Sequence, residues 1–494
     1  MAVLDRFAKR FGYTKMRQRR PIVKRSFDGG KINRLLTGSG LSSENINTDL
    51  ETHLSTLTQR ARHLSKNDDY VRRFIQLVKQ NVVGHHGLVL RGQIIDDNRT
   101  ADTRANEAVE EAFKDWGMTG SPDVTGKLSW IELQNLAIEH IARDGEFLAK
   151  KITTSDGFKL QVLDPMYLDA SVSLKPKGKQ NAIILGVEVD QNYRPLAYHF
   201  RVNGTAATWR YQGKALQRIP ANEIIHIFRP SFAEQVRGFT PMASAISRLS
   251  MVNGFEEAAL VAARIGASKM GFYIPGDDAA GQYEGDDLDA DGNLIDEVEP
   301  GVFSTLPRGY DVKEFKADYP NISYSDFISS VLKGISAGLG VSYPSLSGDL
   351  SGVNFSSIRT AVLEDREAWK DMQSWLTESL CRPVFEIWLK DALARGIIST
   401  GGNAIGLSRF DKFKRVTFQA RRWAWVDPLK DMNANKVAID NRIRSTSDVI
   451  REQGQDPDEV FAEIARERAQ MDALNIKPME AVQRALDLNE IDQE

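Results

Sequence analysis

The stretch from Thr240 to Ser268 reads TPMASAISRLSMVNGFEEAALVAARIGAS and sets the plan of the chain. Threonine is a good N-cap and proline suits the first helical position, so Thr240-Pro241 predicts the start of a long helix. At 1.5 Å per residue this helix would run roughly 40 Å. Small side chains recur along it, and they would let a second helix approach closely. They are Ala243, Ala245, Ala258, Ala259, Ala262, Ala263 and Ala267.

A second helix is predicted over residues 324–339, where Phe327, Val331 and Ile335 form one row. It contains Gly334 and Gly338, and each glycine inside a helix costs roughly 1 kcal/mol relative to alanine. Close packing against another helix or a kink would explain the pair, and a simple helix end is the plain alternative.

An acidic block separates the two predicted helices, among the strand-like pieces Met270–Ile274, Val302–Leu306 and Val312–Phe315. Blocks of like charge usually mark solvated loops or interaction surfaces. Part of the block, Asp287-Leu-Asp-Ala-Asp-Gly292, fits the first half of a calcium loop, but Val298 stands where the bidentate glutamate belongs. We therefore favour a solvated acidic loop, with calcium at Asp287, Asp289 and Asp291 as the alternative. The acidic residues of the block are Asp277, Asp278, Glu284, Asp286, Asp287, Asp289, Asp291, Asp296, Glu297 and Glu299.

The segments around these helices alternate between helical and extended patterns, which predicts an α+β fold. A capping box at Thr48–Glu51 predicts a helix, and another follows Asp68 until Gly84. The sequence pattern further predicts a strand at Leu88–Ile95, helices at Ala101–Trp116 and Trp130–Ala142, and a polar loop at Gly340–Ser357. A long helix through Ile358, Trp369 and Leu376 follows the loop, and the chain is helical again from Leu429. Short alternating runs indicate a mixed or antiparallel sheet at Phe147–Ile152, Phe158–Leu163, Ile183–Val189, Ala197–Val202 and Ile224–Phe228.

Composition limits the class of protein. The chain is 41% hydrophobic and 27% charged with a net charge of −3, and it lacks an apolar run of eighteen residues, so we expect neither a membrane span nor a signal peptide. The single cysteine, Cys381, excludes an internal disulfide framework. Met1–Arg34 is a basic arm with Asp5 and Asp28 as its acidic residues. An arm that orders on a neighbour or on nucleic acid is one interpretation; a membrane-surface helix or a transit peptide are the others.

Catalytic motifs are incomplete. Gly120–Leu128 resembles a phosphate-binding loop, but it has one residue too many and Leu128 replaces the hydroxyl that would reach magnesium. The histidines lack metal-ligand spacing, and adjacent His85 and His86 would point apart in regular structure. His226 is predicted to be a hydrogen-bonded core or edge residue, and Cys381 an inert core thiol. We therefore predict a protein without enzymatic activity; a phage nucleic-acid or capsid-processing enzyme and a plain capsid protein are the alternatives.

The order of several motifs carries a family resemblance along essentially the whole chain. The chain resembles the lambda-type phage portal proteins, the head-tail connectors. The stretches concerned are Arg60-Ala-Arg62-His-Leu64 with Lys66-Asn67, Asn81-Val-Val-Gly84, Arg143-Asp-Gly-Glu-Phe-Leu148, Gln235-Val-Arg-Gly238 with Pro241, Leu339-Gly-Val-Ser-Tyr343, Leu346-Ser-Gly-Asp349, Asn354-Phe-Ser-Ser357 with Arg359, Trp425-Val-Asp-Pro428 with Lys430, Gln453-Gly454, Asp458-Glu-Val460 and Ile464-Ala-Arg-Glu467.

The resemblance implies a portal fold and a division of the chain. In order, the implied parts are a basic arm (1–25), an α+β wing (26–238), a first stem helix (239–268), a β clip with the acidic loop (269–323), a second stem helix (324–339), a channel loop (340–357), a spine helix with the remaining wing (358–427) and a helical crown (428–494). Candidate DNA-facing residues are Lys333, Ser347, Asp349, Ser351 and Asn354, and candidate clip docking residues are Asp286, Asp287, Asp289 and Asp291.

The resemblance also implies partners. The chain would form a ring, normally of twelve copies, at one capsid vertex, and conduct double-stranded DNA without sequence preference. Further partners would be the terminase large subunit, a head-tail connector, and the major capsid and scaffold proteins. The protein would be part of the virion and would assemble in the host cytoplasm. Neither a cofactor nor a membrane is implied.

Overall fold

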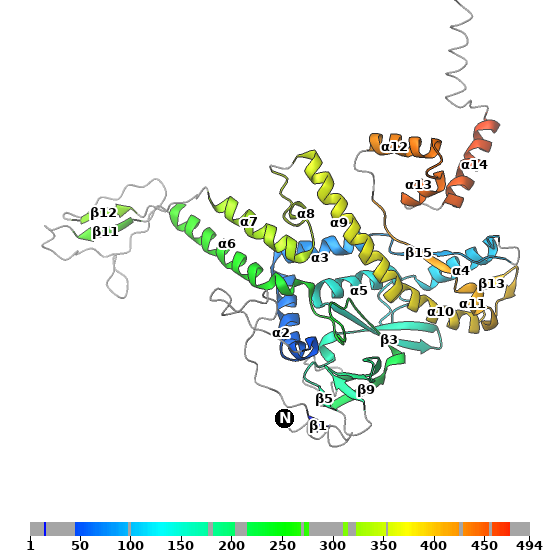
Figure 1. Ribbon diagram of the computed structural model, residues 1–494, viewed down its shortest axis with the longest axis horizontal. Coiled ribbons are helices and arrows are strands. Elements are labelled where there is room, and N and C mark those ends of the chain that lie inside the picture. The colour runs from blue at the N-terminus through cyan, green and yellow to red at the C-terminus, as the bar shows by residue number, and fades with distance from the viewer. Residues whose placement is uncertain are drawn as a thin grey trace, which may run out of the picture.

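The structure is a computed structural model that describes residues 14–15, 45–96, 100–175, 181–202, 215–267, 271–275, 310–314, 323–351, 354–423, 428–453 and 457–474. Its described parts combine helices and strands, as the sequence predicts (Figure 1). Every strand pair within the described sheets is antiparallel. Helices in the described residues include none long and apolar enough to cross a membrane.

Four helices cover the first part of the described chain. They are α2 (Ile46–Asn67), α3 (Asp69–Val82), α4 (Thr103–Trp116) and α5 (Trp130–Asp144). The capping box predicted at Thr48 is wrong, because the Asn45 side chain accepts from the Asn47 amide and starts the helix earlier. His85 and His86 do not lie in regular structure, where we expect them to point apart. They lie in a turn after α3, and their ring centroids are 3.8 Å apart.

Two sheets follow the helices. β10 (Ile224–Phe228), β3 (Glu146–Thr154) and β4 (Gly157–Leu163) form a three-stranded sheet in that spatial order. The run predicted as one strand at Ile183–Val189 is two strands, because Leu185 and Gly186 turn the chain with positive φ. The second sheet has the spatial order β1 (Thr14–Lys15), β5 (Leu174–Lys175), β6 (Ala182–Ile184), β7 (Val187–Val189), β8 (Pro195–Val202) and β9 (Ala215–Pro220).

A helix pair extends from this body toward β11 (Gly271–Pro275) and β12 (Tyr310–Glu314), which pair with each other (Figure 1). Thr240 caps a 3-10 turn over Pro241–Ser244, and α6 (Ile246–Ala267) begins only after that turn. The predicted helix start at Thr240-Pro241 is therefore a separate turn. The second predicted helix is confirmed as α7 (Ser323–Leu339).

The loop predicted at Gly340–Ser357 is partly helical. Pro344 lies in the first turn of α8 (Tyr343–Ser347), and α9 (Phe355–Leu376) begins inside the predicted loop. The prediction fails because Leu346 is buried and fixes the turn against the body. A π-helical turn at Thr377–Cys381 then joins α9 to α10 (Arg382–Ala394).

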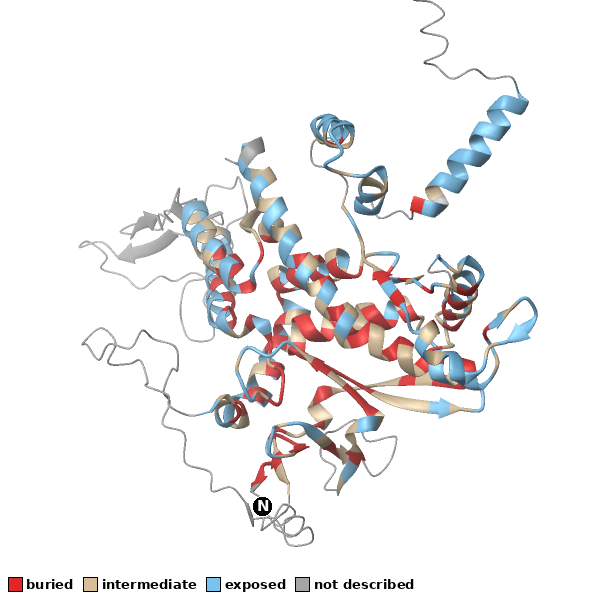
Figure 2. Ribbon diagram, turned by 45° about the vertical axis from the view of Figure 1, so that its right-hand side comes forward, coloured by how far each residue is buried: buried red, intermediate tan, exposed pale blue. Residues whose placement is uncertain are grey.

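The remaining elements are short or peripheral. β15 (Val416–Gln419) pairs with β2 (Val89–Gly92), β13 (Ser399–Thr400) pairs with β14 (Asn403–Ala404), and α11 spans Phe410–Phe413. The C-terminal helices are α12 (Pro428–Asp440), α13 (Thr446–Glu452) and α14 (Pro457–Ala473), and most of α14 is exposed (Figure 2).

The largest core lies where α3, α5 and α10 meet the three-stranded sheet (Figure 2). Aromatic rings fill one end of it: the Phe113 ring lies 5.5 Å from Phe385 and 4.9 Å from Trp388, and Trp116 stacks on Phe158. Cys381 is fully buried in this core, as predicted, and burial raises the pKa of its thiol. This body is the platform from which the helix pair extends.

Candidate functional site: the helix pair and the loop that follows it

The helix pair is anchored by a buried ion pair at its base. Arg237 lies just before the turn into α6, and its guanidinium contacts the Glu146 carboxylate at 2.5 Å and 2.8 Å. The same guanidinium donates to the carbonyls of Leu168 and Leu185 at 2.7 Å and 2.8 Å, and both charged side chains are 3% exposed. Burial alone would raise the pKa of Glu146, but Arg237 and then His226 hold it at about 2.

Two glycines let the backbones meet at this anchor. Gly145 ends α5 with φ +89°, and a Cβ there would run into the Phe239 carbonyl. A Cβ on Gly238 would meet the Gly145 carbonyl in turn. Side chains at these positions would therefore separate α5 and β3 from the segment that leads into α6.

His226 completes the anchor. Its Nε2 lies 3.1 Å from Glu146 Oε2, and its side chain is buried. The prediction of a hydrogen-bonded core histidine is confirmed.

A second ion-pair network joins other sequence motifs. Arg62 of α2 contacts Asp144 at 2.8 Å and Asp164 at 2.7 Å, and Arg143 contacts Asp144 at 3.1 Å. The segments around Arg62, around Arg143 to Glu146 and around Arg237 are therefore adjacent in space. They hold α2, α5 and the base of the helix pair together.

The two helices run antiparallel and contact each other along their length. A Cβ on Gly334 would lie 2.5 Å from Arg248 Nη1, and one on Gly338 would lie 3.2 Å from Ser244 Oγ. Farther along the pair, Phe255 stacks on Tyr324 with ring centroids 5.7 Å apart. Close packing is confirmed at Gly338, whose partner is the 3-10 turn that precedes α6. At Gly334 only the end of the flexible Arg248 side chain lies near, so close helix packing there stays a prediction.

The pair is also tied to α3. Asn253 donates to Asp68 at 2.9 Å, and the Tyr70 hydroxyl donates to Glu256 at 3.2 Å. Burial and the Glu256 carboxylate raise the pKa of Tyr70 to about 12. This contact fixes the direction in which α6 leaves the body.

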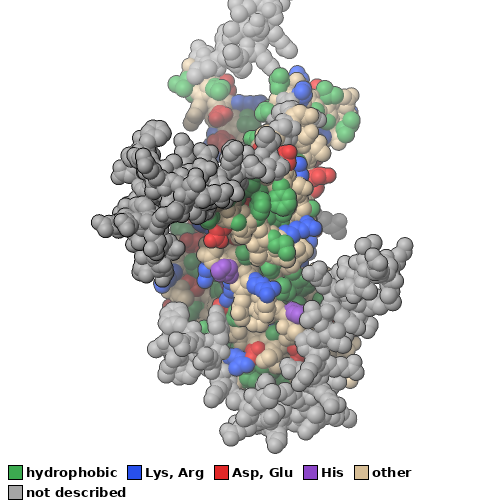
Figure 3. Space-filling model, turned by 90° about the vertical axis from the view of Figure 1, so that its left-hand side faces the viewer, with side chains coloured by type: hydrophobic (Ala, Val, Ile, Leu, Met, Phe, Trp, Pro, Cys, Tyr) green, Lys and Arg blue, Asp and Glu red, His purple; other side chains and the backbone are tan. Residues whose placement is uncertain are grey.

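Several large hydrophobic side chains of the pair are exposed. Hydrophobic side chains gather near the middle of the face in Figure 3, which views the molecule from this end. The exposed large hydrophobic residues of the pair are Met251, Phe255, Leu260, Val261 and Phe327. Exposed hydrophobic side chains on these helices are candidates for contact with a partner.

The loop after α7 is held by a single carboxylate from α9. Asp365 accepts from the Ser342 amide at 2.9 Å, the Ser342 hydroxyl at 2.6 Å and the Ser345 hydroxyl at 2.7 Å. On the other side, Arg73 of α3 donates to the Ser345 carbonyl at 3.2 Å. The first half of the loop is therefore fixed between α3 and α9.

Four of the five predicted DNA-facing residues gather around Tyr343. Its hydroxyl donates to Asp349 at 2.8 Å, its carbonyl accepts from Ser347, and the Lys333 ammonium lies 5.6 Å from its ring centroid. Ser351 donates to Asp349 through its hydroxyl and its amide, and these bonds lower the pKa of the Asp349 carboxyl.

The fifth residue, Asn354, lies apart as the N-cap of α9, where it accepts from the Ser357 amide at 2.8 Å. Asp286, Asp287, Asp289 and Asp291 lie outside the described residues. Groups of three or more potential metal ligands are absent from the parts of the chain that the structure describes.

The sequence pattern alone does not reveal Asp365, Tyr343, Glu146 and Arg237 as positioning residues. A signal existed for the loop: Ser342-Tyr-Pro344 carries a capping residue and a proline suited to the first helical turn. The partner of Arg237 lies 91 residues away, and no local pattern reveals it.

Packing contacts, helix caps and ion pairs make up this site, which is the pattern of a structural protein. Comparison with known proteins gives the family: the model described as phage portal protein, lambda family, matches residues 33–373. The chain belongs to this family, whose members are structural, and it is a portal protein of the capsid vertex and part of the virion.

Three relatives carry portal names. The chain is 31% identical to the probable portal protein of Halomonas phage phiHAP-1, over 93% of this chain and 89% of that one. It is 22% identical to the portal protein of Escherichia phage N15, over 91% of each chain. It is 21% identical to portal protein B of Escherichia phage lambda, over 88% of this chain and 87% of that one.

Solved structures of gene transfer agent particles are more distant. The neck of the empty particle matches 82% of this chain and 94% of that one, with TM-score 0.40 and 15% identity. The virion of the native particle matches with the same coverage, TM-score 0.43 and 14% identity. The family assignment does not depend on them.

Proposed function

We propose that twelve copies of this chain form a ring at one capsid vertex that conducts double-stranded DNA into and out of the capsid. The observation that carries the proposal is the antiparallel pair α6–α7, on which large hydrophobic side chains are exposed among the described residues. A ring covers such side chains by repetition, because each copy meets its neighbour through the same heterologous contact.

In this proposal the parts of the chain keep the roles that the resemblance implies. Residues 239–268 and 324–339 are the stem, 269–323 the clip, 26–238 the wing, 358–427 the spine helix with the remaining wing, and 428–494 the crown. The loop 340–357 lines the channel, with Lys333, Ser347, Asp349, Ser351 and Asn354 toward DNA. Asp365 holds the first half of the loop at Ser342 and Ser345. Ser347 and Asp349 both contact Tyr343, so these polar side chains would have fixed neighbours as DNA passes.

Electron microscopy of purified protein tests the ring. We expect axially pierced, rotationally symmetric particles for the native chain and for Met118→Asp, whose residue is 61% exposed outside the helix pair. Leu260→Asp, at a residue 67% exposed on α6, should abolish the rings while the subunit stays folded by circular dichroism. If Leu260→Asp still forms rings, the proposed contact between stem helices of neighbouring copies is wrong. If the native chain is monomeric, the proposed ring is wrong.

Docking is proposed for the acidic clip loop. Its carboxylates would bind basic surfaces of the terminase large subunit and of the head-tail connector by charge complementarity. Pull-down experiments should show weaker binding of the terminase large subunit and of the head-tail connector when four aspartates are neutralised together, namely Asp286, Asp287, Asp289 and Asp291. Undiminished binding would refute the proposal. Calcium at Asp287, Asp289 and Asp291 stays a minor alternative, which isothermal titration calorimetry tests.

Assembly would take place in the host cytoplasm, with the major capsid and scaffold proteins as further partners. The energy for packaging would come from a separate terminase, so we propose that the chain itself has no ATPase activity. A phosphate-release assay on purified rings tests this, and ATP turnover by the rings alone would contradict it.

A further inference from the structure

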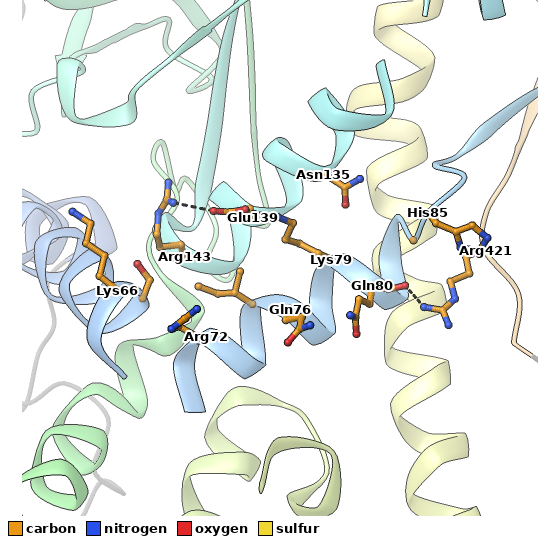
Figure 4. A pocket seen from close by; sticks show the side chains of 13 residues that line it. Lys66, Arg72, Gln76, Lys79, Gln80, His85, Asn135, Glu139, Arg143 and Arg421 are labelled. Atoms are coloured by element: carbon orange, nitrogen blue, oxygen red, sulfur yellow. Dashed lines mark hydrogen bonds and ion pairs between the residues drawn. The ribbon is translucent and has the colours of Figure 1, made fainter. Parts of the chain in front are cut away.

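A groove of about 920 Å³ runs along α3, on the side that faces α5. Five cations line it, Lys66, Arg72, Lys79, Arg143 and Arg421, together with the carboxylate of Glu139. Figure 4 shows Lys66 and Arg143 at one end of the groove and Lys79 near its middle. Arg421 lies beside His85 at the opposite end. The groove therefore carries a row of positive charge about as long as α3, or roughly 20 Å at 1.5 Å per residue.

Three of these cations are held in place by the protein. Lys79 and Arg143 contact Glu139 at 2.7 Å and 3.3 Å. Arg421 donates to the Gln80 carbonyl, and a Cβ on Gly84 would lie 2.9 Å from Arg421 Cδ. The groove is thus a built feature, and its walls keep their shape without a ligand.

The other two cations, Lys66 and Arg72, are exposed and form no ion pair with any described residue. Their charge is available to a ligand. Glu139 is the one carboxylate in the described lining. It and Asp144 already pair with Lys79 and Arg143, so the charge of Lys66 and Arg72 favours an anion as the ligand.

The lining distinguishes between classes of anion. Protein interfaces are enriched at their centres in aromatic residues, methionine and arginine. This groove shares only the arginines: Ile75 is its one aliphatic side chain, and its described lining has neither Trp, Tyr, Phe nor Met. Phosphate oxygens are contacted mainly by Arg, Lys, Ser, Asn and Gln, and the groove offers all five types. Its chemistry therefore favours a phosphodiester backbone over an acidic protein.

The position of the groove agrees with this ligand. Arg72 lines the groove, while the next residue, Arg73, reaches the Ser345 carbonyl in the loop after α7. A nucleic acid that passes the loop is therefore close to the groove.

We propose that this groove is a second, sequence-independent contact for the phosphate backbone of double-stranded DNA, separate from the channel loop. The inference rests on the proposed function, since that function supplies the DNA. Lys66 and Arg72 bind phosphates directly, and the paired cations provide the surrounding positive potential.

The test compares the full-length chain with the double variant Lys66→Gln, Arg72→Gln. A matched control, Arg194→Gln with Arg409→Gln, removes the same charge from exposed positions outside the groove. Binding of a fluorescent duplex of arbitrary sequence is measured by anisotropy at salt concentrations from about 50 to about 200 mM. Over this range phosphate contacts make the affinity strongly salt-dependent. Electron microscopy records the assembly state of each preparation.

Each lost phosphate contact should make the slope of log K against log salt shallower by about 0.9, so we expect a change of about 1.8 for the groove variant. The control should keep the native slope. A groove variant with the native slope would overturn the proposal. So would a variant that loses rings while the control keeps them, because the groove would then be a contact between copies. Native protein without rings would overturn the proposed function, while the slope comparison would still decide the groove.

Discussion

Replacing Arg237 by methionine should destabilise the joint between the sheet and the helix pair severely. The change leaves the Glu146 carboxylate 3% exposed without its guanidinium and leaves the Leu168 and Leu185 carbonyls without their donor. Removing one partner of a buried ion pair costs about 3–5 kcal/mol, because the remaining charge is buried without compensation. We therefore expect a loss of about 4 kcal/mol in the free energy of unfolding, and faster amide hydrogen exchange across Val236–Ala245.

Arg229→Met is the matched control. Arg229 contacts Asp371 at 2.5 Å, but these side chains are 45% and 67% exposed, so the pair is worth about 0–1 kcal/mol. Both variants are measured by urea denaturation followed by fluorescence and by hydrogen exchange. Equal destabilisation by the two variants would refute the reasoning, because burial would then have no influence on the value of the pair.

Four other predictions follow from the same contacts. The pKa of Glu146 is about 2 in the folded protein and ordinarily 4.5, so its contribution to stability is complete above pH 4.5 and is lost as the pH falls toward 2. In acid titrations, Arg237→Met should therefore remove the pH dependence of the unfolding free energy between pH 4.5 and 2. Asp365→Ala removes the acceptor of Ser342 and Ser345, and about 2 kcal/mol of local stability should be lost as faster hydrogen exchange at Ser342–Ser347, which unchanged exchange would contradict. Gly338→Leu should cost about 1–3 kcal/mol of stability, because the side chain would overpack against Ser244, whereas Gly334→Ala meets only the movable end of Arg248 and should be neutral or stabilising. Equal urea midpoints for the two variants would count against tight packing at Gly338. Asn354→Ala should cost about 1 kcal/mol of α9 stability, read from exchange in its first turn, and no change there would show that the cap is dispensable.

Local patterns predict the regular elements well. The apolar period from Trp130 to Ala142 and the run Ile224–Phe228 recur in the structure as α5 and β10, because each is decided by neighbours in sequence. Boundaries are less predictable: Asn45 and Thr48 are both competent caps, and the contact of Asn47 with Glu234 favours the earlier start.

The site depends on contacts that no local pattern contains. The polar sequence of residues 340–357 predicts a loop, but buried Leu346 and the distant Asp365 fold its first half into α8. Arg237 looks like an ordinary exposed arginine until the fold places Glu146 beside it. Resemblance to portal proteins identifies such segments by their order along the chain, yet the chemistry that joins them becomes visible only in three dimensions.

The unbroken run of α9, the π-helical turn and α10 has a mechanical consequence. From Phe355 to Ala394 it forms a rod of roughly 60 Å, which begins at the cap of the serine-rich loop and ends near Asp391, whose carboxylate accepts from the Phe158 amide of β4. A helix resists compression along its axis, so a force on the loop would be transmitted along the rod toward β4. The rod therefore couples the serine-rich loop mechanically to one edge strand of the three-stranded sheet.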